Sequence, residues 1–170
     1  MIIKAAHFAV AAHSGQFRKF GHVNRPYVMH PGRVAARVSI LPEATEVMVA
    51  AAWLHDVVED TRFGIGELQL VFGQAVALLV GELTNTSKQQ YPGLNREGRK
   101  AKDRERLVSV SREAKSIKLI DRIDNLMETE DDLETPCEFA ELYRYESGLL
   151  LDVLRGTDAG LEAELEALLV

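Results

Sequence analysis

The chain has 170 residues, of which 46% are apolar, 27% are charged and one is a cysteine. Such a chain can bury one compact core, so we expect a single globular domain over residues 1–170. The lone Cys137 excludes a disulfide within the chain and favours a reducing compartment, with the cytosol as the default. No uncharged apolar run of about 18 residues occurs, which argues against a membrane span.

The charge is unevenly distributed along the chain. The net charge is −6, but residues 88–118 contain ten basic and four acidic side chains, so this segment carries +6 and the remainder −12. The segment is either a solvated helix with mixed ion pairs or a cationic wall that faces an anionic ligand, and composition alone leaves both open. The overall acidity argues against a general nucleic-acid binder.

Helical periodicity dominates the chain, and strand-like alternation is hard to find. Proline and glycine mark the breaks between the periodic segments. Most connections are short, which predicts one packed all-α bundle, whereas the longer loops 14–31 and 84–96 are expected to be functional. The predicted helices cover residues 2–13, 32–41, 43–60, 66–83, 97–110, 112–129, 136–155 and 158–169.

The segment AAAWLHDVVEDT, residues 50–61, is the first sign of a metal site. On a helix, His55 and Glu59 lie one turn apart, and Asp56 and Asp60 repeat that step about 100° around the axis. Stacked acids repel each other, and the preceding apolar run makes unpaired charge costly. A surface His–Asp pair beside solvated acids is the simpler alternative, but the helical phase of all four groups favours a divalent cation.

A second polar pattern lies in SIKLIDRIDNL, residues 116–126. Lys118, Asp121, Arg122 and Asn125 fall at i, i+3, i+4 and i+7, while isoleucine and leucine cover the other faces. A helix that is apolar on several faces is buried on several sides, so its polar stripe needs partners. The stripe either lines a site or forms an internal salt bridge between Asp121 and a neighbouring cation, and the two interpretations stay equal.

His30, in the segment YVMHP, supplies a further potential ligand. A lone histidine is usually structural, but together with His55, Asp56 and Asp121 it would give two imidazoles and two carboxylates. This mixture suits Mn²⁺, Fe²⁺, Zn²⁺ or Ni²⁺ better than Ca²⁺ or Mg²⁺, which prefer oxygen ligands.

Three motifs, in this order, carry a family resemblance. They are H-x-x-Q-x-R-K with P-Y-x-x-H-P in residues 13–31, L-H-D-V-V-E-D-T in residues 54–61, and I-K-L-x-D-R-x-x-N in residues 117–125. Together they resemble the hydrolase domain of the RelA/SpoT alarmone enzymes. Because no synthetase domain follows, the chain is most similar to the stand-alone small alarmone hydrolases, which include metazoan homologues.

The resemblance implies an HD-domain helical fold and a Mn²⁺ ion held by His30, His55, Asp56 and Asp121. It also implies a nucleotide substrate, ppGpp or pppGpp, whose 3′-pyrophosphate is removed to give GDP or GTP and pyrophosphate.

The resemblance further implies the roles of five other side chains. Glu59 and Asp60 would position and deprotonate the attacking water. Arg18, Lys19 and Asn125 would line the nucleotide pocket, with Arg18 stacking on the base.

Some features depart from the family pattern or match it only loosely. The segment between Lys19 and Pro26 is longer than usual, which leaves the base preference open. Asp124 stands where the bifunctional members usually carry histidine, and the sequence assigns it no role. The basic residues 96–106 are similar in character to the family's phosphate-facing region, and Tyr143 and Arg144 are candidate substrate contacts.

Two alternatives compete with a guanosine alarmone hydrolase. The same metal centre could hydrolyse another nucleotide, such as (p)ppApp or NADPH. A non-catalytic nucleotide sensor is the second alternative, although a sensor would be free to lose Glu59 or Asp60 and both are present. The sequence predicts no membrane partner and leaves the oligomeric state open.

Overall fold

The computed structural model describes residues 1–18, 25–131 and 135–170, and in these ranges the chain is helical. No β-strand occurs in the described ranges, where one isolated bridge pairs Phe17 with Pro26. The all-α prediction is therefore confirmed. The helices are α1 (Ile2–Ala12), α2 (Met29–Val38), α3 (Glu46–Leu54), α4 (Val57–Asp60), α5 (Ile65–Phe72), α6 (Gln74–Leu83), α7 (Ser87–Gln90), α8 (Arg96–Leu107), α9 (Arg112–Asp131), α10 (Cys137–Leu154) and α11 (Ala159–Ala167).

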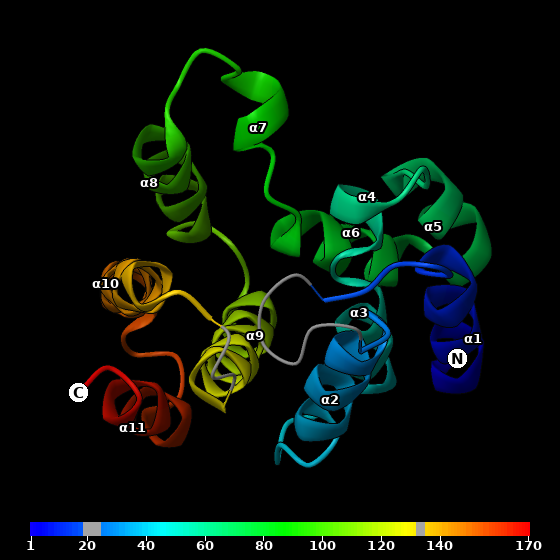
Figure 1. Cartoon of the computed structure of the whole chain (residues 1–170). Helices are drawn as coiled ribbons and strands as arrows, with labels where there is room; N and C mark the ends of the chain where they lie inside the picture. Colours follow the sequence, from blue (N-terminus) through cyan, green and yellow to red (C-terminus); the bar gives the residue numbers. More distant parts are fainter. Residues whose placement is uncertain (19–24, 132–134) are drawn as a thin grey trace.

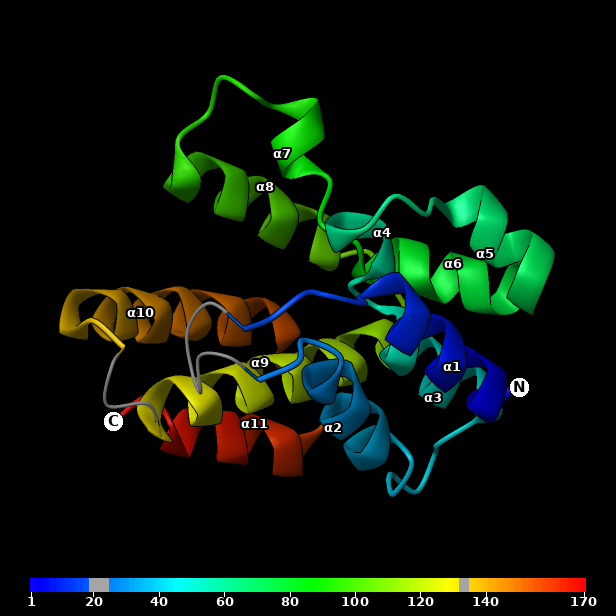
Figure 2. The same ribbon diagram turned by 45° about the vertical axis from the view of Figure 1, so that its right-hand side comes forward.

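The long helix α9 runs through the middle of the molecule (Figures 1 and 2). Helices α2, α3 and α6 pack on one side of it, and α10 and α11 pack on the other. Its apolar side chains therefore meet neighbours on several faces, as the sequence predicted. The fully buried ones are Ala114, Ile117, Leu119, Ile120, Ile123 and Leu126.

The remaining helices are attached to this central assembly. Helix α1 packs on α3, and α5 packs on α6. Helices α7 and α8 pack on each other and stand out from the body, where α8 reaches α10 (Figure 2). The side chain of Asn95 caps α8 by accepting a hydrogen bond from the backbone N–H of Gly98.

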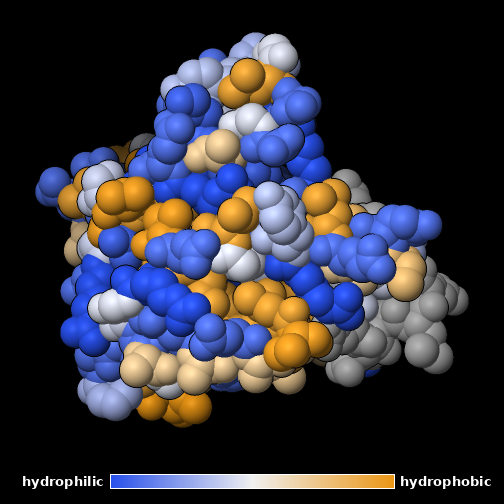
Figure 3. All heavy atoms as spheres, turned by 90° about the vertical axis from the view of Figure 1, so that its left-hand side faces the viewer, coloured by the Kyte–Doolittle hydropathy of each residue, from blue (hydrophilic) through white to orange (hydrophobic). Residues whose placement is uncertain are grey.

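The surface over α7 and α8 is mainly hydrophilic. On the face that carries α8, α10 and α11, hydrophilic residues predominate and apolar residues are interspersed among them, both on the projecting part and across the body (Figure 3). None of the helices in the described ranges combines the length and the apolar character that crossing a membrane requires.

Two predicted helices are each interrupted. The helix predicted over residues 43–60 begins at Glu46, after the cap residue Thr45, and breaks at His55–Asp56. Asp56 has φ −97° and ψ −5°, at the edge of the helical region, so α4 starts a new turn. The helix predicted over residues 66–83 breaks at Gly73, whose φ of +89° suits glycine and ends α5.

Other boundaries also differ from the predictions. Helix α2 begins at Met29 rather than at residue 32, so His30 lies in its first turn. The loop predicted over residues 84–96 contains the short helix α7. Helix α9 continues to Asp131, two residues beyond its predicted end. Proline and glycine indicate where helices stop, but short helical turns inside polar segments lack a periodic signal.

Candidate metal centre and adjoining pocket

Four predicted metal ligands converge where α2, the end of α3 and α9 meet. His30 comes from the first turn of α2, His55 caps α3, Asp56 follows it, and Asp121 lies in the middle of α9. The ligand atoms of His30, His55 and Asp56 all lie within 4.8 Å of one another. The structure thus brings residues 91 positions apart in the chain into one cluster.

The distances inside this cluster place each imidazole against a carboxylate. Nε2 of His30 lies 3.1 Å from Oδ1 of Asp121 and 3.7 Å from Oδ2 of Asp56. Nε2 of His55 lies 3.0 Å from Oδ2 of Asp56 and 3.7 Å from Oδ1 of Asp121. The two rings stand edge to face, with their centroids 5.2 Å apart. Two nitrogens and two carboxylates therefore face one point.

A buried ring nitrogen in the cluster has an unsatisfied hydrogen-bonding capacity, which fits the binding of a divalent cation. Nδ1 of His55 lies 2.8 Å from the backbone oxygen of Ala52, which orients Nε2 toward the carboxylates. That Nε2 is buried, and its contacts with Asp56 and Asp121 lack the geometry of a hydrogen bond. A buried polar atom without a partner is costly, and a metal ion bound there would remove that cost.

The electrostatics of the cluster also indicate tight coupling. Burial by itself would raise the pKa of Asp56, but the neighbouring His55 imidazole outweighs it and lowers that pKa. Burial would lower the pKa of His55, yet the charge of Asp56 and the contact with Asp121 raise it well above its usual value. A metal ion bound here would compete with protons for the imidazole nitrogens.

Asp121 both forms an internal salt bridge and faces the candidate site, so the two interpretations of the polar stripe on α9 hold together. Its Oδ2 pairs with Nζ of Lys118 at 2.8 Å, so the internal salt bridge exists. Its Oδ1 faces the imidazoles and accepts a hydrogen bond of 2.7 Å from Nδ2 of Asn125. The ammonium of Lys118, which is buried, contributes to a pKa of Asp121 well below the usual range although burial opposes this.

The two predicted catalytic acids, Glu59 and Asp60, lie on α4 and line the cavity that Asp56 and Asp121 also line. Oε1 of Glu59 accepts hydrogen bonds from the backbone N–H and the side-chain amide of Asn85, at 2.6 and 3.0 Å. The side chain keeps contact with solvent. Loss of hydration within the cleft and the charge of Asp56 nonetheless raise the pKa of Glu59 to about 7, against the opposing Lys118 ammonium.

Four cations also line this cavity. Lys100 and Arg104 come from α8, and Lys118 and Arg122 come from α9. Burial, together with the nearby charges of Arg122 and Lys118, lowers the pKa of Lys100. The basic segment is therefore a wall facing the acidic residues of α4, rather than only a solvated helix face.

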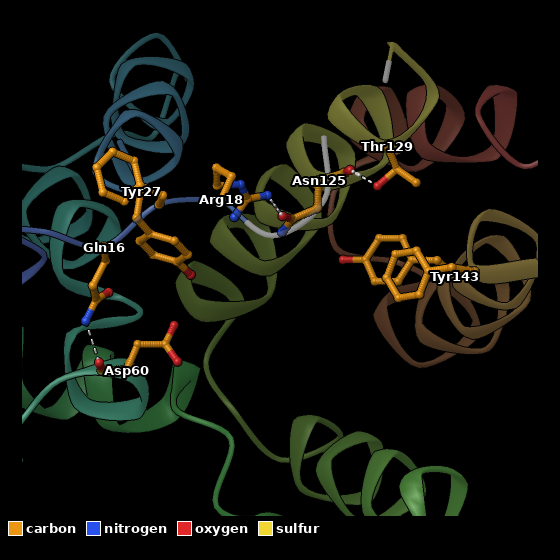
Figure 4. Close-up of a pocket in the computed structure, with 9 residues that line it drawn as sticks. Gln16, Arg18, Tyr27, Asp60, Asn125, Thr129 and Tyr143 are labelled. Carbon is orange, nitrogen blue, oxygen red and sulfur yellow. Dashed lines mark hydrogen bonds between the residues drawn. The ribbon is translucent and has the colours of Figure 1, made fainter. Parts of the chain in front are cut away.

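A second cavity of about 550 Å³ adjoins the first. The two share four lining residues, so they form one continuous cleft; these are Tyr27, Asp60, Asn125 and Tyr143. Figure 4 shows Arg18 and Asn125 meeting at the centre of the second cavity, with Tyr27 and Tyr143 on opposite sides. The rings of Phe139 and Tyr143 stack with centroids 5.7 Å apart, which gives this cavity a flat aromatic wall.

Two of the three predicted nucleotide-binding residues lie together in the second cavity. Nη2 of Arg18 donates a 2.5 Å hydrogen bond to Oδ1 of Asn125, so these two are brought together. Lys19 lies outside the described residues. Tyr143 lines both cavities, whereas its neighbour Arg144 lines neither.

Several residues of the site had no role in the sequence prediction. The hydroxyl of Tyr27 donates to Oδ2 of Asp56 at 2.6 Å, and Asn85 holds Glu59. On α9, Asp124 and Glu128 lie at i+3 and i+7 from Asp121, and Glu128 extends the polar stripe by one turn beyond Asn125. Continuing the stripe beyond Asn125 would have found Glu128, but nothing local points to the roles of Asp124 and Asn85.

Comparison with known proteins places the chain in a family. A model of the HD domain matches residues 5–143. MESH1 of Xenopus tropicalis, a guanosine-3′,5′-bis(diphosphate) 3′-pyrophosphohydrolase, is 35% identical and covers 98% of this chain and 91% of its own length. The protein of the same name from Drosophila melanogaster is also 35% identical, over 94% of this chain and 87% of its own length.

Longer proteins and solved structures agree with this placement. A probable guanosine-3′,5′-bis(diphosphate) 3′-pyrophosphohydrolase of Synechocystis is 36% identical, but the chain spans only 16% of its length. A solved metazoan orthologue of SpoT, described as hydrolysing ppGpp, superposes with a TM-score of 0.86 at 33% identity, covering 98% of this chain and 92% of that one. Because the family model spans most of the chain and the MESH1 relatives match nearly all of it, the chain belongs to the HD-domain family, among the MESH1-like proteins.

Proposed function

We propose that this protein hydrolyses the 3′-pyrophosphate of (p)ppGpp in a Mn²⁺-dependent reaction, giving GDP or GTP and pyrophosphate. The observation that carries the proposal is one continuous cleft with three parts: a cluster of metal-ligand type, an acid with a pKa near neutrality, and a cationic wall. The adjoining aromatic cavity extends this cleft toward a nucleoside.

The metal would be held by His30, His55, Asp56 and Asp121. A mixed nitrogen and oxygen set suits Mn²⁺ and related transition metals better than Mg²⁺ or Ca²⁺. A divalent ion in this position supplies Lewis-acid chemistry, since it polarises a phosphoryl group and lowers the pKa of water.

Glu59 is the proposed general base, and Asp60 helps to position the water. A carboxylate with a pKa of about 7 is well matched to accept a proton near neutral pH. The hydrogen bonds from Asn85 reach both oxygens of Glu59, Oε1 most closely, and anchor the carboxylate at the cleft. As the water oxygen bonds to the 3′-linked phosphorus, Glu59 takes the water proton and the bond from that phosphorus to the ribose 3′ oxygen breaks. The 3′ oxygen leaves with the bonding electron pair and takes a proton from solvent to become the hydroxyl of GDP or GTP.

The substrate would lie across the two cavities. The cations Lys100 and Arg104 on α8 face the acids and would neutralise the pyrophosphate as charge develops on it. Arg18 and Asn125 would contact the nucleoside, together with Lys19. The stacked pair Phe139 and Tyr143 offers a flat apolar surface for the base.

The test is an assay of the purified protein with ppGpp and Mn²⁺, with and without a chelator. We expect pyrophosphate and GDP in equal amounts, with activity lost on chelation and restored by added Mn²⁺. Absence of metal-dependent pyrophosphate release contradicts the proposal. Parallel kinetics on ppApp and NADPH decide between guanosine alarmones and other nucleotides, and tight binding of ppGpp without turnover identifies a sensor.

A further inference from the structure

Asp124, which the sequence left without a role, lies behind the metal cluster. It is on α9, one turn beyond Asp121, and is 6% exposed. Its Oδ2 lies 2.6 Å from Nδ1 of His30. Nε and Nη2 of Arg33, one turn along α2, donate to Oδ1 and Oδ2 at 2.7 and 2.9 Å. The carboxylate is therefore clamped in one orientation and directed at the far side of a proposed metal ligand.

The two histidines of the cluster are oriented by different partners. Nδ1 of His55 is bonded to a backbone oxygen of its own helix, that of Ala52. Nδ1 of His30 is bonded to a side chain of another helix, Asp124. In both cases Nδ1 faces an acceptor and must carry the hydrogen, which leaves the Nε2 lone pair for a metal.

We infer that Asp124 is a positioning residue that holds His30 in the tautomer and ring orientation needed to bind the metal. The inference rests on the metal centre of the proposed function. A carboxylate behind a ligating imidazole fixes its tautomer and makes its other nitrogen a stronger ligand. Asp124 gives His30 the orientation that His55 obtains from the backbone.

Arg33 connects this carboxylate to the nucleoside cavity. Its Nη2 lies 2.5 Å from Oε1 of Glu128, and the other oxygen of Glu128 lies 2.7 Å from Nη2 of Arg18. The charges alternate along this line from Asp124 to Arg18, so each buried carboxylate has a cation beside it. Glu128 thus belongs to the same ion-pair network but lies on the side away from the metal, which makes it a matched control.

The experiment measures Mn²⁺ binding in the absence of nucleotide, by electron paramagnetic resonance of the free ion. We expect Asp124→Asn to weaken Mn²⁺ binding by about 10- to 100-fold. The substitution removes the carboxylate charge and replaces one of the two acceptor oxygens with an amide group that donates. Glu128→Gln removes a buried charge from the same network and is expected to change Mn²⁺ affinity by less than about twofold. Equal Mn²⁺ affinity in folded Asp124→Asn and wild type overturns the inference.

A second measurement needs no variant and covers the case in which Asp124→Asn does not fold. Nitrogen-15 NMR of the Zn²⁺-loaded wild type is expected to show His30 protonated at Nδ1 and bound to the metal through Nε2. Metal bound through Nδ1 of His30 overturns the inference. Wild-type protein that binds neither Mn²⁺ nor Zn²⁺ contradicts the proposed function itself, so the two failures are distinguishable.

Discussion

The two walls of the cleft are built in different ways. The metal wall comes from α2, α3 and α9, which pack on one another in the core, and its ligands are deeply buried: His30 is 1%, His55 2% and Asp121 5% exposed. The cationic side draws Lys118 and Arg122 from α9, but its other two cations, Lys100 and Arg104, come from α8, which projects from the body and touches α7 and α10. The geometry of the candidate metal centre is therefore set by the core packing, whereas the part of the cationic side that α8 supplies is held by fewer contacts.

This difference predicts graded effects of substitution. A change in the metal wall removes a ligand and leaves its partners buried without it, so its effect is close to all-or-none. A change in the cationic wall removes one of several charges that remain partly hydrated, so its effect is partial.

The largest effect is expected for Asp121→Asn. It removes a proposed ligand and also the carboxylate that pairs with Lys118. We expect loss of Mn²⁺ binding and a fall in kcat/KM of about 10³-fold or more. The control is Glu113→Gln, which makes the same charge change at an exposed position of α9. Activity of Asp121→Asn comparable to that of Glu113→Gln would show that Asp121 is not a ligand.

A smaller but still severe effect is expected for Glu59→Gln. The amide keeps the shape of the side chain but cannot accept the water proton. We expect kcat to fall by about 10²- to 10⁴-fold while Mn²⁺ affinity stays close to that of the wild type. Parallel measurement of bound metal and of turnover separates this variant from Asp121→Asn, and loss of both properties together would place Glu59 among the ligands instead.

The pH dependence of the wild type should report the same carboxylate. Glu59 acts as a base only when ionised, and its pKa is raised to about 7 in the metal-free cleft. A bound cation favours the ionised form, so at saturating Mn²⁺ we expect kcat to rise with pH and level off at or below about 7. The ascending limb should be absent in Glu59→Gln; a limb retained in that variant belongs to another group.

The smallest effect is expected on the cationic wall, for Lys100→Met. Lys100 lines the cleft opposite the acids, and losing one charge-assisted contact should raise KM for ppGpp by about tenfold with little change in kcat. Lys102→Met is the matched control, because Lys102 lies two positions along α8 and pairs with Glu105 at the surface. Equal KM values for the two variants would show that Lys100 does not contact the substrate.

The sequence predicted the helical class and most helices because apolar spacing and the proline and glycine breaks are local signals. It missed the break at His55–Asp56, since the apolar pattern continues through it and only the backbone at Asp56 departs from the helix. It also missed the break at Gly73, because a single glycine is tolerated in many helices.

The site shows the same division between local and distant information. The helical phase of His55, Asp56, Glu59 and Asp60 grouped four side chains that do lie at one cleft. The contact of Asp124 with His30 depends on how α2 and α9 cross, 94 residues apart in the chain, and no periodic pattern encodes that crossing. For the same reason the hydrogen bond from Asn85 to Glu59 could be found only in the structure.

The most direct test of the central claim follows the water oxygen. Mn²⁺-loaded protein would hydrolyse ppGpp in ¹⁸O-labelled water, and mass spectrometry would locate the label in the products. Attack at the 3′-linked phosphorus predicts one ¹⁸O in the released pyrophosphate and none in GDP. Label in GDP, or no pyrophosphate at all in the presence of Mn²⁺, would contradict the account.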